Sequence, residues 1–284
     1  MPKGLFVKSY IREVYKQLKY SPFWKPLHQI NDLFYVFRYL LMGKEKISDD
    51  DIKNVEINVT FIFKSFNRQK QAKRLYRCIR RYYPKVRIII ADDSKDPLII
   101  DGAEIIYLPF NSGLSKGLIT ALDRVKTPYV MRMDDDELLT PHSNVHGQLS
   151  YLQSHPNIDL VGLQASCRNP ERMAQKYSRI KMNKSLIIPA GTIIDGREVV
   201  YKSPNIFLAR TEKLKLVGYD PNIRMNDHHE FFYRAAGKMV SVQDPKSYVM
   251  HCHNRFEREY DLYRRDTGND SLYIRAKHGI NYYK

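Results

Sequence analysis

The class of fold is indicated most clearly by the segment Tyr129-Val130-Met131-Arg132-Met133-Asp134-Asp135-Asp136-Glu137-Leu138-Leu139. A short apolar run leads directly into three carboxylates, which predicts a buried strand whose end carries acids. Open α/β sheets bind their ligands at such strand ends. Adjacent carboxylates raise one another's pKa, so a Mg²⁺ or Mn²⁺ ion that also binds phosphate oxygens would keep them ionised. A solvated acidic turn is the alternative.

Upstream of this strand, residues 56–128 alternate between strand and helix patterns. Buried strands separated by helices predict a parallel sheet with right-handed crossovers. We therefore expect an α/β fold with a Rossmann-like half, a mixed, mainly parallel central sheet and helices on both faces. The predicted strands span 57–63, 86–91 and 104–108, and the predicted helices span 69–83 and 118–125, with a glycine loop at 111–117.

Polar side chains follow each predicted strand and can face one crevice. Lys64, Asn67 and Arg68 follow the first strand, Asp92 and Asp93 the second, Lys116 lies in the glycine loop after the third, and the three acids follow the fourth. The chain lacks both the GxGxxG pattern of dinucleotide folds and the GxxxxGK[ST] pattern of nucleoside triphosphatases. The crevice is therefore predicted to bind a nucleoside diphosphate donor for a group transfer.

Composition limits the compartment and the partners. Forty-seven Lys and Arg against 31 Asp and Glu give a net charge of +16, which predicts polyanionic partners: nucleic acid, an anionic membrane or phosphate-bearing substrates. The cysteines Cys78, Cys167 and Cys252 form no CxxC pair, which argues against a disulfide framework or a zinc knuckle. A reducing compartment fits best.

Residues 1–55 form a predicted helical appendage. An amphipathic basic helix over 6–18 precedes an aromatic segment over 29–42, and an acidic run at 48–51 starts a linker. Such helices suit either an anionic bilayer surface or packing against the main domain or a second subunit. No secretory signal pattern and no apolar run long enough to span a bilayer is present. We expect a cytoplasmic protein, peripheral on the inner face of the cytoplasmic membrane.

The ordered motifs resemble the metal-dependent GT-A glycosyltransferases of the family 2 type, especially the β-1,4-N-acetylgalactosaminyltransferases that build gangliosides, and related bacterial sugar transferases. The resemblance covers residues 56–255, leaving 1–55 and 256–284 as appendages. The matching segments are 59–68, 79–84, 89–94, 129–136, 159–162, 205–213, 217–221 and 229–232.

The resemblance implies roles for the crevice residues. Asp92 would contact the uracil ring, with Asp93 shaping the pocket. Asp136 would ligate Mn²⁺ or Mg²⁺ and Asp134 would face the ribose or metal waters. Lys116 would meet phosphate. Asp135 lies in the donor site but, by strand alternation, should point to the opposite face and matter least to the metal.

A catalytic base is also implied. Glu230 matches the acid that precedes two aromatic residues, whose rings would raise its pKa. Asp227 is the alternative base. In the segment 249–253, alternation places His251 and His253 on one face as metal ligands, and turns Cys252 into the core. His253 aligns better than His251.

Three parts depart from the family. Residues 168–194 match little and should form a loop or flap over the substrates, Gly117 stands where the family has Asn, and the tail from Phe256 has no match. The predicted function is inverting transfer of a hexose or N-acetylhexosamine from a UDP-sugar to a lipid-linked capsule or lipopolysaccharide precursor. A nucleic-acid-binding protein, suggested by the basic helix, and an inactive scaffold for polysaccharide assembly are the alternatives.

Overall fold

The computed structural model describes residues 13–165, 169–254, 256–264 and 268–279. The chain divides into two compact units: Met1–Gly43 with Cys252–Asp266, and Lys44–His251 with Thr267–Lys284. The division at residues 55 and 255 that the sequence suggested stays a prediction.

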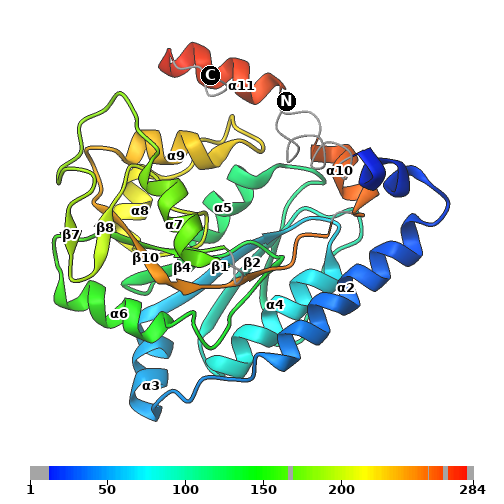
Figure 1. Ribbon diagram of the computed structural model, residues 1–284, viewed down its shortest axis with the longest axis horizontal. Helices are drawn as coiled ribbons and strands as arrows, with labels where there is room; N and C mark the ends of the chain where they lie inside the picture. The colour runs from blue at the N-terminus through cyan, green and yellow to red at the C-terminus, as the bar shows by residue number, and fades with distance from the viewer. Residues whose placement is uncertain (1–12, 166–168, 255, 265–267, 280–284) are drawn as a thin grey trace, which may run out of the picture. The chain divides into compact units, whose positions relative to one another are not determined.

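The larger unit is built on one mixed β-sheet (Figure 1). In the part of the chain that the structure describes, nine strands follow the order β3-β2-β1-β4-β9-β6-β10-β8-β7. Their pairings set β8 and β9 against the direction of the others, so the predicted mixed, mainly parallel sheet is confirmed. The strands are β1 (Val59–Ser65), β2 (Arg87–Asp92), β3 (Glu104–Tyr107), β4 (Tyr129–Arg132), β6 (Leu160–Gln164), β7 (Ile193–Ile194), β8 (Arg197–Val199), β9 (Phe207–Arg210) and β10 (Ser241–Tyr248).

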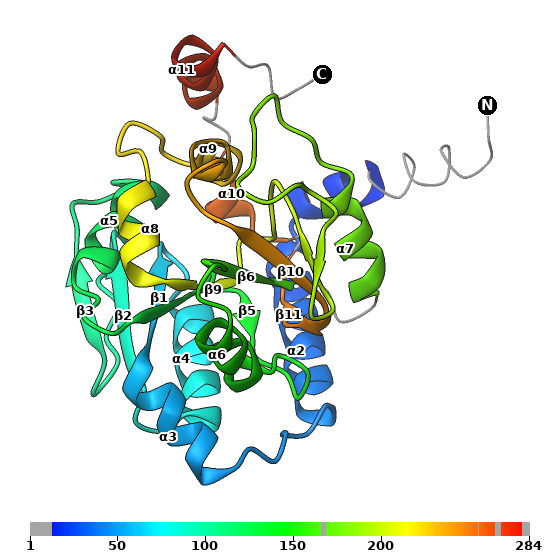
Figure 2. The same cartoon turned by 90° about the vertical axis from the view of Figure 1, so that its left-hand side faces the viewer.

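Helices cover both faces of this sheet (Figures 1 and 2). α5, α8 and α9 lie on one face, where Leu118, Leu214 and Phe231 pack into the main apolar core. α4 and α6 lie on the other face, with α3 beside α6. Leu75 of α4 is fully buried, which stabilises the fold by about 1.5–3 kcal/mol. The helices are α3 (Asp49–Asn58), α4 (Gln69–Tyr82), α5 (Leu114–Asp123), α6 (Val145–Ser154), α7 (Pro170–Ser178), α8 (Thr211–Val217), α9 (Asp227–Ala235) and α11 (Gly268–His278).

Several predicted boundaries differ from the structure. α5 begins at Leu114 and not at residue 118, so it includes the end of the predicted glycine loop, and β1 begins at Val59 because α3 continues to Asn58. The predicted linker after Ser48 is the helix α3, because the Ser48 side chain caps it by accepting the Asp51 N–H, and three acids occupy its positive end. The predicted loop over 168–194 contains α7, which Asn169 caps by accepting the Arg172 N–H.

The smaller unit contains α2 (Trp24–Leu41) and α10 (Arg258–Arg264). Residues 13–20 are helical, and the rest of the predicted first helix lies outside the described residues. α2 begins before the predicted residue 29 because Pro26 occupies its first turn, where no backbone donor is needed. Within the unit, the Tyr35 hydroxyl donates to the His253 carbonyl and the Asn254 amide donates to the His28 carbonyl. No helix in the described ranges is long and apolar enough to span a membrane.

Candidate active site

The three predicted acids follow the buried strand β4 at its carboxyl end. β4 pairs in parallel with β1, so the acids lie at the same edge of the sheet as Lys64 and Arg68. Asp135 and Asp136 are buried, whereas the Asp134 side chain is 38% exposed. The predicted placement of acids at a strand end is thus confirmed.

A buried arginine joins two of the acids. Arg68 Nη1 lies 2.7 Å from Asp135 Oδ1, and Nη2 lies 3.0 Å from Asp136 Oδ2. Both carboxylates therefore face one guanidinium, and the prediction that Asp135 points to the opposite face is wrong. Strand alternation does not apply to it, because β4 ends at Arg132 and the acids lie in the turn beyond. Burial alone would raise the pKa of Asp136, but the Arg68 charge and a hydrogen bond from His251 hold it well below its usual range.

Asp134 is held by groups that sequence analysis missed. Arg132, fully buried, places Nη2 2.8 Å from Asp134 Oδ1 and donates from Nη1 to the Asn205 carbonyl. Glu137 Oε2 accepts the Asp134 N–H at 2.8 Å. Burial, reinforced by the charge of Asp134, raises the pKa of Glu137 to about 8. The sequence did contain a signal for this ion pair, because Arg132 lies inside an apolar strand and a buried charge needs a partner of opposite charge.

A second, two-stranded sheet brings a histidine to the acids. β11 (Met250–His251) pairs antiparallel with β5 (Glu137–Leu138), which sets His251 opposite Glu137. His251 Nε2 lies 3.4 Å from Asp136 Oδ2. Burial alone would lower the pKa of His251, but its hydrogen bond to Asp136 and the nearby carboxylates raise it to about 9. A carboxylate oxygen next to an imidazole nitrogen is a donor set that can hold a divalent metal ion.

His253, the other predicted ligand, follows His251 by two residues and belongs to the smaller unit. Cys252, between the two histidines, is buried as predicted.

The residues after β1 and β2 brace the loops of the crevice. Lys64 Nζ lies 2.6 Å from Asp93 Oδ1, and Asp93 Oδ2 accepts the Gly113 N–H at 3.0 Å. Burial lowers the pKa of Lys64 and the Asp93 charge opposes that shift. Asn67, at φ 51°, accepts the Lys95 N–H through its side chain. These contacts fix the first crevice loops to one another and to the glycine loop.

Asp92, the predicted uracil contact, is 1% exposed and engaged at both oxygens. Oδ1 accepts from the Ser94 hydroxyl at 2.5 Å, and Oδ2 accepts the Leu98 N–H at 2.7 Å. Its carboxylate therefore shapes the loop after β2, and its contact with a base stays a prediction.

The glycine loop needs its glycines for close packing. A Cβ at Gly113, at φ 100°, would lie 2.9 Å from Arg224 Cγ, and the adjacent Leu114 N–H donates to the Arg224 carbonyl at 2.7 Å. A Cβ at Gly117 would lie 2.5 Å from Lys64 Cγ, so an Asn at this position would require the Lys64 side chain to move. Lys116 is exposed in the first turn of α5, where a cation can meet an anionic ligand.

Asp227 is the first residue of α9 and is 2% exposed. Its Oδ2 has no hydrogen-bond partner among the described residues. Burial raises the pKa of Asp227 to about 6; the Arg132 charge opposes the shift and the Asp134 charge adds to it. A buried carboxylate with an unpartnered oxygen can accept a proton near neutral pH.

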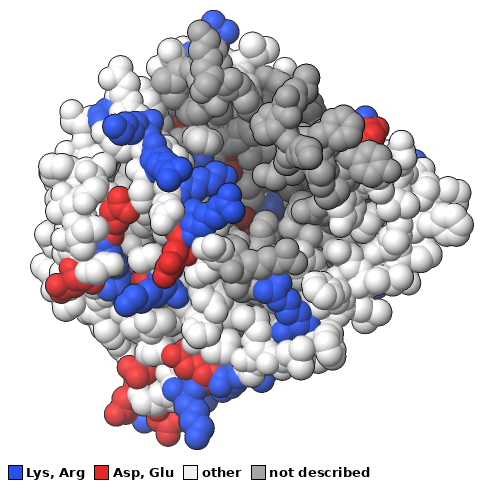
Figure 3. Space-filling view, viewed as in Figure 1, with Lys and Arg blue, Asp and Glu red and all other residues white. Residues whose placement is uncertain are grey.

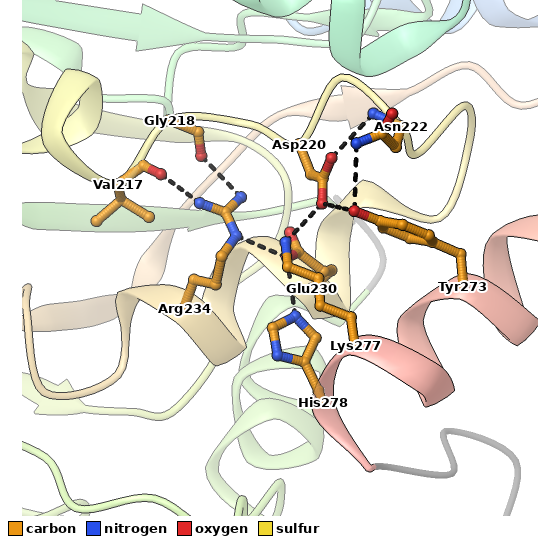
Figure 4. A network of polar contacts seen from close by, with 9 residues as sticks. All are labelled: Val217, Gly218, Asp220, Asn222, Glu230, Arg234, Tyr273, Lys277 and His278. Carbon is orange, nitrogen blue, oxygen red and sulfur yellow. Dashed lines mark hydrogen bonds and ion pairs between the residues drawn. The ribbon is translucent and has the colours of Figure 1, made fainter.

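Glu230 lies on the same helix in the opposite kind of environment (Figure 4). Its Oε1 lies 2.6 Å from Arg234 Nε, 3.0 Å from Lys277 Nζ and 3.0 Å from His278 Nε2. Burial alone would raise the pKa of Glu230, but hydrogen bonds from Arg234 and His278 lower it. The prediction of a raised pKa is therefore wrong, because the cations of α9 and α11 outweigh the neighbouring aromatic rings.

Lys202 is a further site residue that sequence analysis missed. It is 4% exposed, and burial lowers its pKa to about 7 against the opposing charge of Asp227. No sequence pattern around Lys202 indicates that it is buried.

On the outer surface, basic side chains gather over α7 and the loop that follows it (Figure 3). The exposed members are Arg172, Lys176, Arg179, Lys181 and Lys184.

Solved structures of low sequence identity share this fold. The mannosyltransferase PcManGT from Pyrobaculum calidifontis, in complex with GDP-Man and Mn²⁺, superimposes with a TM-score of 0.52 at 14% identity, covering 89% of this chain and 74% of that one. S. aureus TarS 1–349 in complex with UDP gives a TM-score of 0.50 at 13% identity, covering 68% of this chain and 59% of that one. The architecture is that of GT-A glycosyltransferases.

Curated relatives and a family model match the sequence. Mouse beta-1,4 N-acetylgalactosaminyltransferase 2 is 30% identical over 249 residues, covering 80% of this chain and 46% of the relative. Human beta-1,4 N-acetylgalactosaminyltransferase 1 is 31% identical over 207 residues, covering 66% and 37%. The chain thus spans less than half the length of these relatives. The model of glycosyl transferase family 2 matches residues 60–234, and the chain belongs to that family.

Proposed function

We propose that this glycosyltransferase moves a hexose or N-acetylhexosamine from a UDP-sugar to a hydroxyl of a glycan acceptor with inversion, and that Asp227 is the base. The observation that carries the proposal is the buried Asp227 carboxylate, whose Oδ2 has no partner among the described residues. Arg132 links it electrostatically to Asp134 at the end of β4. The proposed proton acceptor is thus within electrostatic range of one of the acids proposed to hold the donor.

In the proposed reaction, Asp227 Oδ2 takes the proton of the acceptor hydroxyl while the hydroxyl oxygen attacks the anomeric carbon. The bond from that carbon to the diphosphate oxygen breaks, and its electron pair leaves with UDP. A single displacement inverts the anomeric configuration and needs one base. Glu230 is less suited to this step, because Arg234, Lys277 and His278 all contact its carboxylate and stabilise its ionised form.

Asp136 and His251 are the proposed centre of a metal site, with Asp134 acting through metal waters or the ribose. His253 is the proposed further ligand, since two residues of extended chain reach about 7 Å from His251. Bound Mn²⁺ or Mg²⁺ would neutralise charge on the leaving diphosphate. The other proposed donor contacts are Asp92 and Asp93 at the uracil, Lys116 and Arg68 at phosphate, and Lys64, Asn67 and Asp135 in the pocket around them.

UDP-N-acetylhexosamines are the first donors to test. The mouse and human relatives are N-acetylgalactosaminyltransferases by name, and TarS has been solved in complex with UDP-GlcNAc. For the acceptor we propose a lipid-linked capsule or lipopolysaccharide precursor at the inner face of a cytoplasmic membrane. The net charge of +16 and the exposed apolar side chains of α2 support this assignment.

A UDP-release assay over a panel of nucleotide sugars, with Mn²⁺ or with EDTA, tests the proposal. We expect release with at least one UDP-sugar that requires the metal, and a loss of at least about 100-fold in Asp136→Ala. Asp195→Ala, which removes an exposed acid, is the control and should match the wild type. Full release by Asp136→Ala in Mn²⁺ would contradict the metal assignment. No release with any donor would favour the inactive scaffold.

A further inference from the structure

The C-terminal helix α11 holds the backbone that leads into the Asp227 helix. Asp270, 4% exposed near the start of α11, accepts three consecutive backbone N–H groups. Its Oδ1 accepts from Arg224 at 3.0 Å, and its Oδ2 accepts from Met225 at 2.6 Å and Asn226 at 2.9 Å. These three residues directly precede Asp227.

The other end of α11 contacts the chain on both sides of this segment (Figure 4). Lys277 Nζ donates to Asp220 Oδ2 at 2.5 Å and to Glu230 Oε1 at 3.0 Å. The Tyr273 hydroxyl donates to Asp220 Oδ2 at 3.1 Å. Asp220 precedes the segment and Glu230 follows it, so α11 fixes the chain before, at and after the Asp270 contacts.

These contacts have a physical consequence for Asp227. Backbone N–H groups at a helix N-terminus have no acceptor within the helix, and the positive end of the helix dipole favours a carboxylate there. Asp270 supplies that carboxylate from a different helix to the N–H of the N-cap residue Asn226, and it also accepts from Arg224 and Met225, which precede the helix. The direction in which the first residue of α9 projects its side chain therefore depends on where α11 lies.

We propose that Asp270 is a positioning residue for the catalytic base, and that α11 is part of the catalytic apparatus rather than a passive tail. Asp270 acts on the reaction through the backbone of residues 224–226 and not through the substrate. The proposal rests on the proposed function in one respect, which is that Asp227 is the base. A misplacement of about 1 Å at a reacting group lowers turnover by up to about 100-fold.

The test compares Asp270→Asn with Asp244→Asn. Asp244 is an equally suitable buried acid, 8% exposed, which accepts the Lys246 N–H and hydrogen bonds from Gln148 and Ser247. We expect kcat to fall about tenfold or more in Asp270→Asn, while the KM for the donor stays within about threefold of the wild-type value. The pH below which the rate falls should be the same in the variant and the wild type. Asp244→Asn should retain the wild-type kcat at a temperature where both variants are folded.

Hydrogen exchange of residues 224–235 separates this proposal from the proposed function, because it needs no substrate. We expect faster exchange there in Asp270→Asn and wild-type exchange in Asp244→Asn. Unchanged exchange in Asp270→Asn would overturn the positioning role. Faster exchange in Asp270→Asn together with a kcat equal to that of Asp244→Asn would instead contradict the assignment of Asp227 as the base. If Asp270→Asn does not fold, Lys277→Met, which keeps the aliphatic stem, provides the same comparison with a smaller expected loss.

Discussion

Two carboxylates one helical turn apart on α9 have opposite environments. Asp227 is buried, its Oδ2 has no hydrogen-bond partner within the described part of the chain, and its pKa is raised to about 6. Glu230, in contrast, is surrounded by Arg234, Lys277 and His278 and has a lowered pKa. When two neighbouring carboxylates have pKa values shifted in opposite directions, the one with the raised pKa can exchange a proton and the other stays ionised. At the residue scale, we therefore assign proton transfer to Asp227 and anchoring to Glu230.

The pKa of Asp227 predicts a pH dependence. The base must be ionised to act, so kcat/KM should fall as the pH drops below about 6. Because folding raises this pKa from its usual 3.8, the group stabilises the fold below about pH 4 and that contribution, about 3 kcal/mol, is lost as the pH rises through 6.

Asp227→Asn should consequently have a melting temperature at pH 8 equal to or above that of the wild type, with the difference disappearing at pH 4. Thermal unfolding at the two pH values and a pH–rate profile of the wild type check this. A rate that is flat from pH 7 to pH 5 would be inconsistent with Asp227 as the base.

The positions of individual site residues could be predicted where the neighbouring sequence determines them. Asp134 to Asp136 could be placed because an apolar strand leads directly into them. Lys202 and Asp270 could not, since they reach the site through contacts between segments distant in sequence. The lowered pKa of Glu230 could not be predicted for the same reason, because it depends on side chains of α11 and no local sequence pattern shows that α11 packs against α9. Arg132 lies only two residues before Asp134, and its signal was a charge inside an apolar strand.

At the scale of elements, long periodic segments were predicted within a few residues. Helix α4 ends at Tyr82, next to the predicted end before Pro84, and β2 is displaced by one residue. The two-residue strands β5 and β11 were not predicted as a pair, because their partners are over 100 residues apart in the chain. That pairing brings His251 to Asp136.

Helix α2 exposes an apolar stripe that predicts membrane binding. Its large side chains recur three and four residues apart with exposures of 50–71%, and residues 1–43 carry seven basic and two acidic side chains. The exposed members are Ile30, Leu33, Phe34, Phe37, Leu40 and Leu41. An apolar face with surrounding positive charge fits the surface of an anionic bilayer.

Co-flotation with vesicles checks this prediction. We expect the wild type to bind vesicles that contain anionic lipid and to bind neutral vesicles less. The Phe37→Glu variant should lose at least about tenfold in binding, whereas Leu216→Glu, a matched change at a residue 69% exposed on α8, should not. Wild-type binding by Phe37→Glu would exclude α2 as the contact, and self-association lost in the same variant would indicate a second copy as its partner.

For the molecule as a whole, the alternation of buried strands and helices was enough to predict the α/β architecture. Strands β1 and β2 are buried at all but one of their residues, and β2 carries the continuous apolar run of residues 88–91, as a sheet covered on both faces requires. The course of residues 168–194 could not be predicted, because it is polar and lacks a sustained period, yet it contains α7. The family relationship likewise rests on the ordered set of motifs and on no single one of them.

The central claim is that Asp227 takes the acceptor proton and Glu230 does not. The most direct test is kcat for Asp227→Asn and Glu230→Gln, measured side by side as UDP release with saturating donor, acceptor and Mn²⁺. We expect a loss of about 100-fold to 10,000-fold in Asp227→Asn, with a melting temperature equal to or above that of the wild type. We expect a smaller loss in Glu230→Gln, accompanied by a lower melting temperature. An Asp227→Asn variant with near wild-type kcat, beside an inactive but fully stable Glu230→Gln, would contradict the central claim.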